Sequence, residues 1–171
     1  MNIIYCHHAN RNKSKMPSNT DDITPIGEQD AAIVAELLKM AKDSGVKVAA
    51  IYTSNFYRCV RTADLINKHI AVDIMEDSRL NEFGSVEGES WLDAQLRVKE
   101  VILELIAKYE DSDTVICVTS GVNIAPFICL NFGIDIDENT PFVRVPSCSP
   151  LMFEFPKSKF IGFNTTSVEN N

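Results

Sequence analysis

The fold is constrained most by the way short apolar runs alternate with amphipathic segments along the 171 residues of the chain. Short apolar runs bounded by turn residues are typical of buried strands, and apolar residues at helical spacing indicate helices packed on a core. The runs that predict strands are 2–6, 48–52, 71–75 and 114–118, and the segments that predict helices are 25–43, 56–68, 91–109 and 120–132. This alternation predicts an α/β domain whose mostly parallel sheet has helices on both faces.

The remaining segments predict less regular structure. Residues 9–24 and 77–90 are expected to form loops, and Thr24-Pro25 is typical of a helix start, an N-cap followed by proline. Residues 143–145, 151–155 and 160–163 predict a strand and a hairpin. Because no repeat or linker divides the chain, we expect one domain over 1–168 and a frayed tail over 169–171.

The composition of the chain indicates which classes of binding partner to expect. The chain has 16 Lys and Arg against 24 Asp and Glu, and its net charge of −8 repels phosphate backbones, which predicts no nucleic-acid partner. No apolar run reaches the roughly 20 residues of a membrane span and the first residues do not resemble a leader, so we expect no membrane partner. Five cysteines without a CxxC pair predict reduced, mostly buried thiols and a cytoplasmic location.

Ligands of parallel α/β sheets bind beyond the carboxyl ends of the strands. That rule selects four segments, 6–11, 53–58, 80–88 and 119–122. The first holds His7 and His8, which are either a structural pair or a source of an imidazole nucleophile. Since side chains alternate along a strand, the two rings are expected to point to opposite sides, with at most one facing a given pocket.

The other three segments carry residues suited to an anion. Arg58 is expected in the first turn of a helix, where its guanidinium and free N–H groups suit a phosphate, although a surface arginine is the simpler interpretation. Glu82 is placed to donate a proton to a leaving oxygen, or is merely a solvated loop charge. Ser120-Gly121 marks either another anion site at a helix start or a plain helix cap.

In this order, the segments resemble the histidine phosphatase superfamily, also called phosphoglycerate mutase-like, over nearly the whole chain. The most specific match is the block Ser-x-x-x-Arg-x-x-x-Thr-Ala, present as Ser54, Arg58, Thr62 and Ala63. The other family motifs correspond to His7-His8-Ala9, Ile23–Ala31, Leu80–Gly88 and Thr119-Ser120-Gly121. The resemblance implies a three-layer sandwich and phosphoryl transfer through a phosphohistidine, with no metal or other cofactor.

The resemblance also implies residue roles. His8 is the nucleophile, Glu82 the proton donor, and Arg58 a clamp on the phosphate oxygens. The family's first motif arginine is replaced here by His7, and its late histidine by Ser120, so two cationic donors are changed. Each lost charge-assisted contact costs roughly 1.5–3 kcal/mol, or about 10–100-fold in rate.

Other residues near these motifs are candidates to replace the cationic donors lost at positions 7 and 120. Arg11 lies four residues after His7 and is a candidate to restore one cation, and Gly121 offers a backbone donor. His69 is expected at a helix end away from the site. The phosphate-binding candidates are therefore His7, Arg11, Arg58, Ser120 and Gly121.

Two hypotheses of different classes stay open. The first is an atypical phosphomonoesterase that acts through His8. The second is a catalytically inactive relative that binds a phosphorylated ligand or a phosphorylated protein partner. A cysteine phosphatase is excluded because Cys6 and Arg11 have four intervening residues where that class needs five. Gly-x-Ser-x-Gly, P-loop and zinc-ligand patterns are absent from the sequence.

Overall fold

A single six-stranded sheet runs through the described residues. The computed structural model describes residues 1–12, 19–131, 145–155 and 159–162. Four strands are parallel, β5 is antiparallel to β1, and β6 is antiparallel to β5. In the order β3-β2-β4-β1-β5-β6 across the sheet, they are Ile74–Glu76, Lys47–Thr53, Asp113–Thr119, Asn2–His7, Pro150–Glu154 and Lys159–Gly162. The mostly parallel sheet predicted from the sequence is confirmed.

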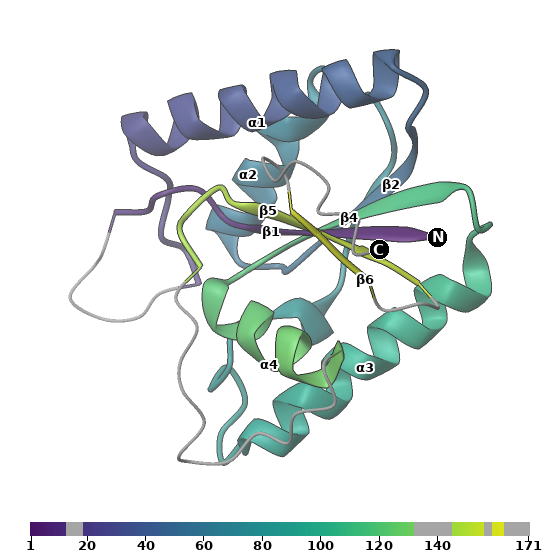
Figure 1. Ribbon diagram of the computed structural model, residues 1–171. Helices are drawn as coiled ribbons and strands as arrows, with labels where there is room; N and C mark the ends of the chain where they lie inside the picture. Colours follow the sequence, from purple (N-terminus) through teal and green to yellow (C-terminus); the bar gives the residue numbers. More distant parts are fainter. Residues whose placement is uncertain (13–18, 132–144, 156–158, 163–171) are drawn as a thin grey trace.

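Helices cover both faces of this sheet, which makes three layers (Figure 1). On one face α1 (Pro25–Asp43) packs against α2 (Tyr57–Asn67), and on the other α3 (Trp91–Lys108) packs against α4 (Gly121–Asn131). A short 3-10 helix, η1 (Ser78–Leu80), precedes α3. In the part of the chain described, no helix is both long and apolar enough to cross a membrane.

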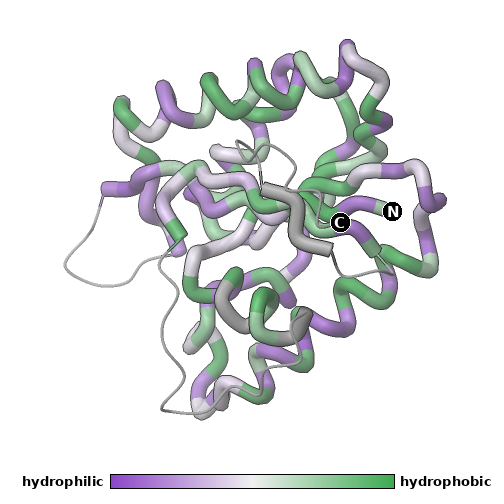
Figure 2. Tube along the Cα trace, viewed as in Figure 1, coloured by the Kyte–Doolittle hydropathy of each residue, from purple (hydrophilic) through white to green (hydrophobic). Residues whose placement is uncertain are grey.

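Two cores form because side chains alternate along the buried strands. Ile4 and Cys6 of β1 join the core beneath α1 and α2, whereas Ile3 and Tyr5 join the core beneath α3 and α4. Figure 2 shows apolar residues along the central strands, and apolar and polar residues interleaved along the long helices. All five cysteines are buried, as the sequence predicted.

Local signals fix the helix ends. The Thr24 side chain accepts a hydrogen bond from the Gly27 amide, and Pro25 is the first residue of α1, so the predicted helix start is confirmed. Helix α1 ends at Ser44, followed by Gly45 at a φ of 101°. Ser90 and Asp93 form a capping box at the start of α3.

The third strand differs from its prediction. It begins at Ile74, not Ala71, because Ala71 has a left-handed φ of 55° that no extended strand accommodates. The Asn67 side chain bonds both backbone groups of Val72 and holds this turn. Residues 143–144 of a predicted strand, Phe132 at the end of a predicted helix, Phe163 at the end of the predicted hairpin, and the tail 169–171 lie outside the described residues.

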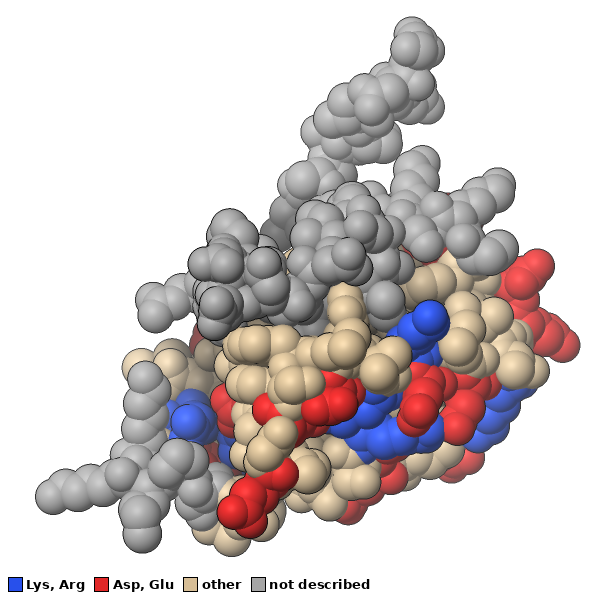
Figure 3. Space-filling model, turned by 90° about the horizontal axis from the view of Figure 1, so that it is seen from below, with Lys and Arg blue, Asp and Glu red and all other residues tan. Residues whose placement is uncertain are grey.

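Charged side chains are interleaved on the face that Figure 3 shows, where basic and acidic groups alternate across the described surface. Ion pairs also brace the segment between β3 and α3. Arg79 pairs with both Asp77 and Glu104, and Arg97 pairs with Glu89.

Candidate active site

His8 lies directly after β1, with 5% of its surface exposed. Its Nδ1 contacts the Ala9 carbonyl at 2.8 Å, and because a carbonyl only accepts, the neutral ring carries its proton on Nδ1. Burial lowers the pKa of His8 to about 3, with His7, Arg58 and Arg11 acting in the same direction and the Ala9 carbonyl opposing them. His8 is therefore neutral at pH 7, with its lone pair on Nε2.

Arg58 joins this ring to a carboxylate. It sits in the first turn of α2 with 2% of its surface exposed, and its Nε–H donates to Nε2 of His8 at 3.1 Å. Its Nη2 forms an ion pair with Glu82, and the Phe56 ring lies 4.8 Å from the guanidinium carbon. One buried cation thus connects the candidate nucleophile with the candidate proton donor.

The side chain of Thr62 links the backbone next to His8 with the backbone of Arg58. The hydroxyl of Thr62 accepts a hydrogen bond from the Ala9 amide at 3.0 Å and donates one to the Arg58 carbonyl at 2.7 Å. The His8 amide donates to the carbonyl of Thr119, at the end of β4. The predicted meeting of strand ends therefore occurs at this edge of the sheet.

His7 and His8 face the same cavity, so the predicted separation of the two rings is wrong. The ring centroids lie 4.5 Å apart, because β1 ends at His7 and His8 no longer follows strand alternation. Nδ1 of His7 contacts the Val145 carbonyl at 2.8 Å, and burial is the main reason why the His7 pKa is lowered. A Cβ at Gly121 would lie 2.9 Å from His7 Cε1, so any larger residue at this position would displace the ring.

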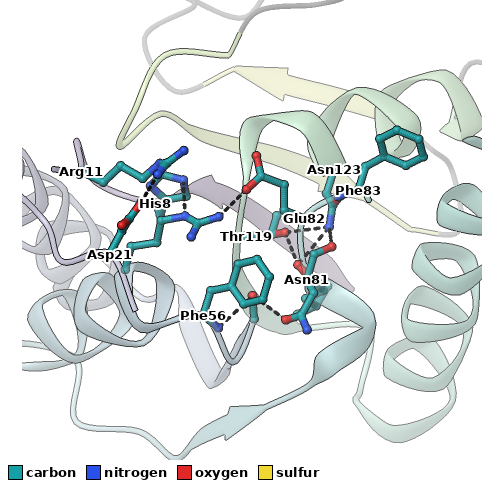
Figure 4. A network of polar contacts seen from close by, with 12 residues as sticks. His8, Arg11, Asp21, Phe56, Asn81, Glu82, Phe83, Thr119 and Asn123 are labelled. Carbon is teal, nitrogen blue, oxygen red and sulfur yellow. Dashed lines mark hydrogen bonds and ion pairs between the residues drawn. The ribbon is translucent and has the colours of Figure 1, made fainter. Parts of the chain in front are cut away.

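Arg11 also reaches the site, as the sequence suggested. It pairs with the buried carboxylate of Asp21, and a β-bridge between Arg11 and Ile23 fixes its backbone (Figure 4). No sequence pattern pointed to Asp21, which lies in a polar loop among other acidic and amide residues. This contact holds one cation next to the two histidines.

Two cavities adjoin at Arg11 and Glu82, which line both. One, of about 610 Å³, also contacts His7, His8 and Gly121, and the other, of about 520 Å³, also contacts Phe56 and Arg58. The Glu82 carboxylate and the Arg11 guanidinium therefore lie between the cavity that contains His8 and the second cavity. An ester bound with its phosphorus near His8 therefore has room for a leaving group.

Ser120 is the predicted site residue that lines neither cavity. It is 2% exposed, and within the described part of the chain its hydroxyl has no hydrogen-bond partner. Gly121 is the first residue of α4 and does line the cavity of His7 and His8. His69 lies beside Glu36, with 42% of its side chain exposed, and lines neither cavity, as expected.

The sequence analysis missed two asparagines that hold the Glu82 segment. Asn123 contacts the backbone on both sides of Glu82, and the Asn81 side chain accepts a hydrogen bond from Ser54 (Figure 4). A polar residue within the first turn of the apolar helix α4 was the signal available for Asn123. Among the residues described, no three His, Cys, Asp or Glu side chains are grouped to hold a metal ion.

Comparisons with known proteins agree with this geometry. The model of the histidine phosphatase superfamily (branch 1) matches residues 7–88. YhfR of Bacillus stearothermophilus is 20% identical in sequence, with 94% of each chain covered and a TM-score of 0.74. A phosphoserine phosphatase from Entamoeba histolytica, solved with phosphoserine, is 18% identical, with 94% of each chain covered and a TM-score of 0.74.

A mycobacterial glucosyl-3-phosphoglycerate phosphatase, solved with VO3, is 16% identical, with 96% of this chain and 99% of that chain covered and a TM-score of 0.72. At these identities the likeness establishes a common fold, which confirms the architecture implied by the sequence resemblance. No curated protein matches the sequence.

Proposed function

We propose that this chain, whose residues 7–88 match the model of the histidine phosphatase superfamily (branch 1), hydrolyses phosphate monoesters through a phosphohistidine on His8. The observation that carries the proposal is the 3.1 Å contact from Arg58 to the unprotonated Nε2 of His8. A neutral imidazole with its lone pair in a cavity is a competent nucleophile. The adjoining guanidinium matches the oxygens of a phosphate placed there.

The first chemical step transfers the phosphoryl group to the ring. A phosphate ester bound as its monoanion takes over the donors of Arg58, which frees Nε2 of His8, and the freed Glu82 carboxylate takes the proton of the phosphate group. Nε2 attacks phosphorus, the bond to the leaving oxygen breaks, and Glu82 gives its proton to that oxygen. The Ala9 carbonyl, 2.8 Å from Nδ1, stabilises the positive charge that the ring gains.

The second step returns the enzyme to its starting state. A water molecule attacks phosphorus, the nitrogen–phosphorus bond breaks, and Glu82 takes the proton that the water loses. Inorganic phosphate leaves with the proton held by Glu82, which restores both the neutral His8 ring and the Glu82 carboxylate. Arg58 and Arg11 stabilise the charge on the phosphate oxygens throughout, since Arg58 donates to His8 and lines one cavity and Arg11 lines both.

The other donors in the site are weaker than those they replace. The Nδ1–H of His7 donates to the Val145 carbonyl. His7 therefore donates to a phosphate only when its Nε2 is also protonated. The α4 N-terminus at Gly121, which lines the cavity of His7 and His8, adds neutral donors. Binding is therefore expected to strengthen as the pH falls toward the range in which His7 gains a proton.

The second candidate function is binding of a phosphorylated ligand or protein without turnover. It is favoured by the substitutions at positions 7 and 120, which leave one neutral imidazole and one hydroxyl in place of two cationic donors. Arg58 and Arg11 are also each paired with a carboxylate before any ligand binds. A bound phosphate must then displace these carboxylates from the two arginines, or share the arginine donors with them.

The test is phosphate release from p-nitrophenyl phosphate and a panel of phosphate esters between pH 4 and 8, for the wild type, His8→Ala and the control His69→Ala. Turnover that His8→Ala abolishes and His69→Ala retains supports the phosphohistidine mechanism, and turnover retained in His8→Ala overturns it. No turnover, with orthovanadate raising the melting temperature of the wild type, supports the binding function. No turnover and no orthovanadate effect contradicts both.

A further inference from the structure

The segment that carries Glu82 is held by a side chain outside the residues of the proposed reaction. The Asn123 amide nitrogen donates to the carbonyl of Leu80 at 3.0 Å and to that of Asn81. Its amide oxygen accepts from the backbone N–H of Phe83 at 2.8 Å. Asn123 therefore bonds backbone groups on both sides of Glu82, and only 1% of its surface is exposed (Figure 4).

A second asparagine anchors the same segment to another strand. The Asn81 side-chain oxygen accepts from the Ser54 hydroxyl at 2.7 Å and from the Asn55 amide at 3.2 Å. Ser54 directly follows β2 and precedes the helix that carries Arg58. The Thr119 hydroxyl adds a bond to the Leu80 carbonyl. The backbone around Glu82 is thus fixed against the elements that position Arg58 and His8.

We infer that Asn123 is a positioning residue, which holds the Glu82 carboxyl where it protonates the leaving oxygen. This role rests on the proposed function and deepens it. The side chain must donate to carbonyls and also accept from an N–H, which an amide does and a carboxylate does not. Asn123 itself lines neither cavity, so its effect on the reaction passes through the backbone of residues 80–83.

A merely structural role predicts a different result. If Asn123 only stabilised the fold, its loss would lower turnover equally for every substrate. A misplaced proton donor instead slows esters of poorly leaving alcohols, such as phosphoserine, whose oxygen needs a proton as it departs. The p-nitrophenolate anion is stabilised by its nitro group and leaves without protonation, so this substrate is expected to be spared.

The experiment compares phosphoserine with p-nitrophenyl phosphate in Asn123→Ala, Asn123→Asp, Glu82→Gln and the control Asn67→Ala. Asn67 is matched because its amide also bonds backbone groups, those of Val72, but at the far end of α2. We expect Glu82→Gln to lower turnover of phosphoserine about 100-fold and Asn123→Ala about tenfold, with much smaller losses for p-nitrophenyl phosphate. Asn67→Ala is expected to lower the melting temperature and leave the ratio of the two rates unchanged.

Equal losses on both substrates in Asn123→Ala, with Glu82→Gln still selective, would overturn the positioning role alone. An inactive wild type would instead refute the proposed hydrolysis, and the positioning role with it. Should Asn123→Ala not fold, Asn123→Asp decides in the same way, since it keeps the volume and the acceptor but removes the N–H donors. Selective loss in Asn123→Asp supports the inference, and a wild-type ratio overturns it.

Discussion

The Nε–H of Arg58 donates a 3.1 Å hydrogen bond to Nε2 of His8, while the same guanidinium pairs with Glu82. A lysine has one ammonium group and does not present a planar set of donors to both partners. We expect Arg58→Lys to lower kcat/KM by about 10–100-fold, the equivalent of one lost charge-assisted contact. Steady-state phosphate release measures this effect.

Arg61 provides the control for Arg58, because it lies one turn further along α2 and pairs with Glu28 on the surface of the helix. Its side chain is 33% exposed, and such pairs contribute little to stability. Arg61→Lys is expected to leave kcat/KM unchanged. Equal losses from Arg58→Lys and Arg61→Lys would show that the contact with His8 has no role in turnover.

The buried His8 makes stability depend on pH. Its pKa is about 3 in the folded chain, against roughly 6.5 in the unfolded chain. Between these values the unfolded chain binds a proton that the folded chain does not, so the folded state loses stability as the pH falls from 6.5 toward 3. From pH 7 to pH 5, His8 alone is expected to lower the free energy of unfolding by about 2 kcal/mol.

Denaturant unfolding at several pH values measures this loss. The lowered pKa of His7 acts in the same direction, so His8→Asn is expected to flatten the pH dependence without removing it. The exposed His69 is the control, and His69→Asn should keep the wild-type dependence. A His8→Asn curve parallel to that of the wild type would show that His8 is not held neutral by the fold.

Much of the architecture and part of the site were predictable from the sequence, because both depend on periodicity and strand ends. The alternation of runs predicts the order of elements, and parallel strands bring their carboxyl ends to one edge. This is why His8, Arg58 and Glu82 were selected from segments far apart in the chain and lie together. The start of α1 was predictable because Thr24 and Pro25 act locally.

The rest depended on conformations that no local pattern specifies. The two histidine rings share a cavity because β1 stops one residue before His8, and a strand end is uncertain by about that much in any prediction from sequence. Ala71 adopts a left-handed φ that alanine does not favour. The residue type therefore gave no reason to predict that β3 begins only after this position. Asn123 and Asp21 act through partners about 40 and 10 residues away, respectively.

Asp21 is expected to act on the site only through Arg11. Its carboxylate is buried and pairs with the Arg11 guanidinium, which lines both cavities. Arg11→Ala should weaken binding of orthovanadate by about 10–100-fold, since one charge-assisted contact is lost. Asp21→Asn keeps the cation but loosens its position, so a smaller loss is expected. Titration calorimetry measures both affinities, and a larger loss in Asp21→Asn than in Arg11→Ala would contradict this order.

Alanine substitutions at two glycines are expected to have different effects, one on the backbone and one on the site. A Cβ at Gly27 would lie 2.4 Å from the Asn10 carbonyl oxygen, whereas the atoms nearest to a Cβ at Gly121 belong to the His7 ring. Gly27→Ala is therefore expected to lower the melting temperature strongly, because backbone must move. Gly121→Ala displaces a side chain and its bond to the Val145 carbonyl, at a cost of about 1 kcal/mol.

The effect of Gly121→Ala on ligand binding should pass through His7, which a double-mutant cycle tests. We expect Gly121→Ala to weaken orthovanadate binding in the wild-type background and to have no further effect in His7→Ala, because the displaced ring is already gone. Calorimetric titration of the four proteins gives the coupling. Additive losses would mean that Gly121 acts on the anion through the N-terminus of α4 and not through the imidazole of His7.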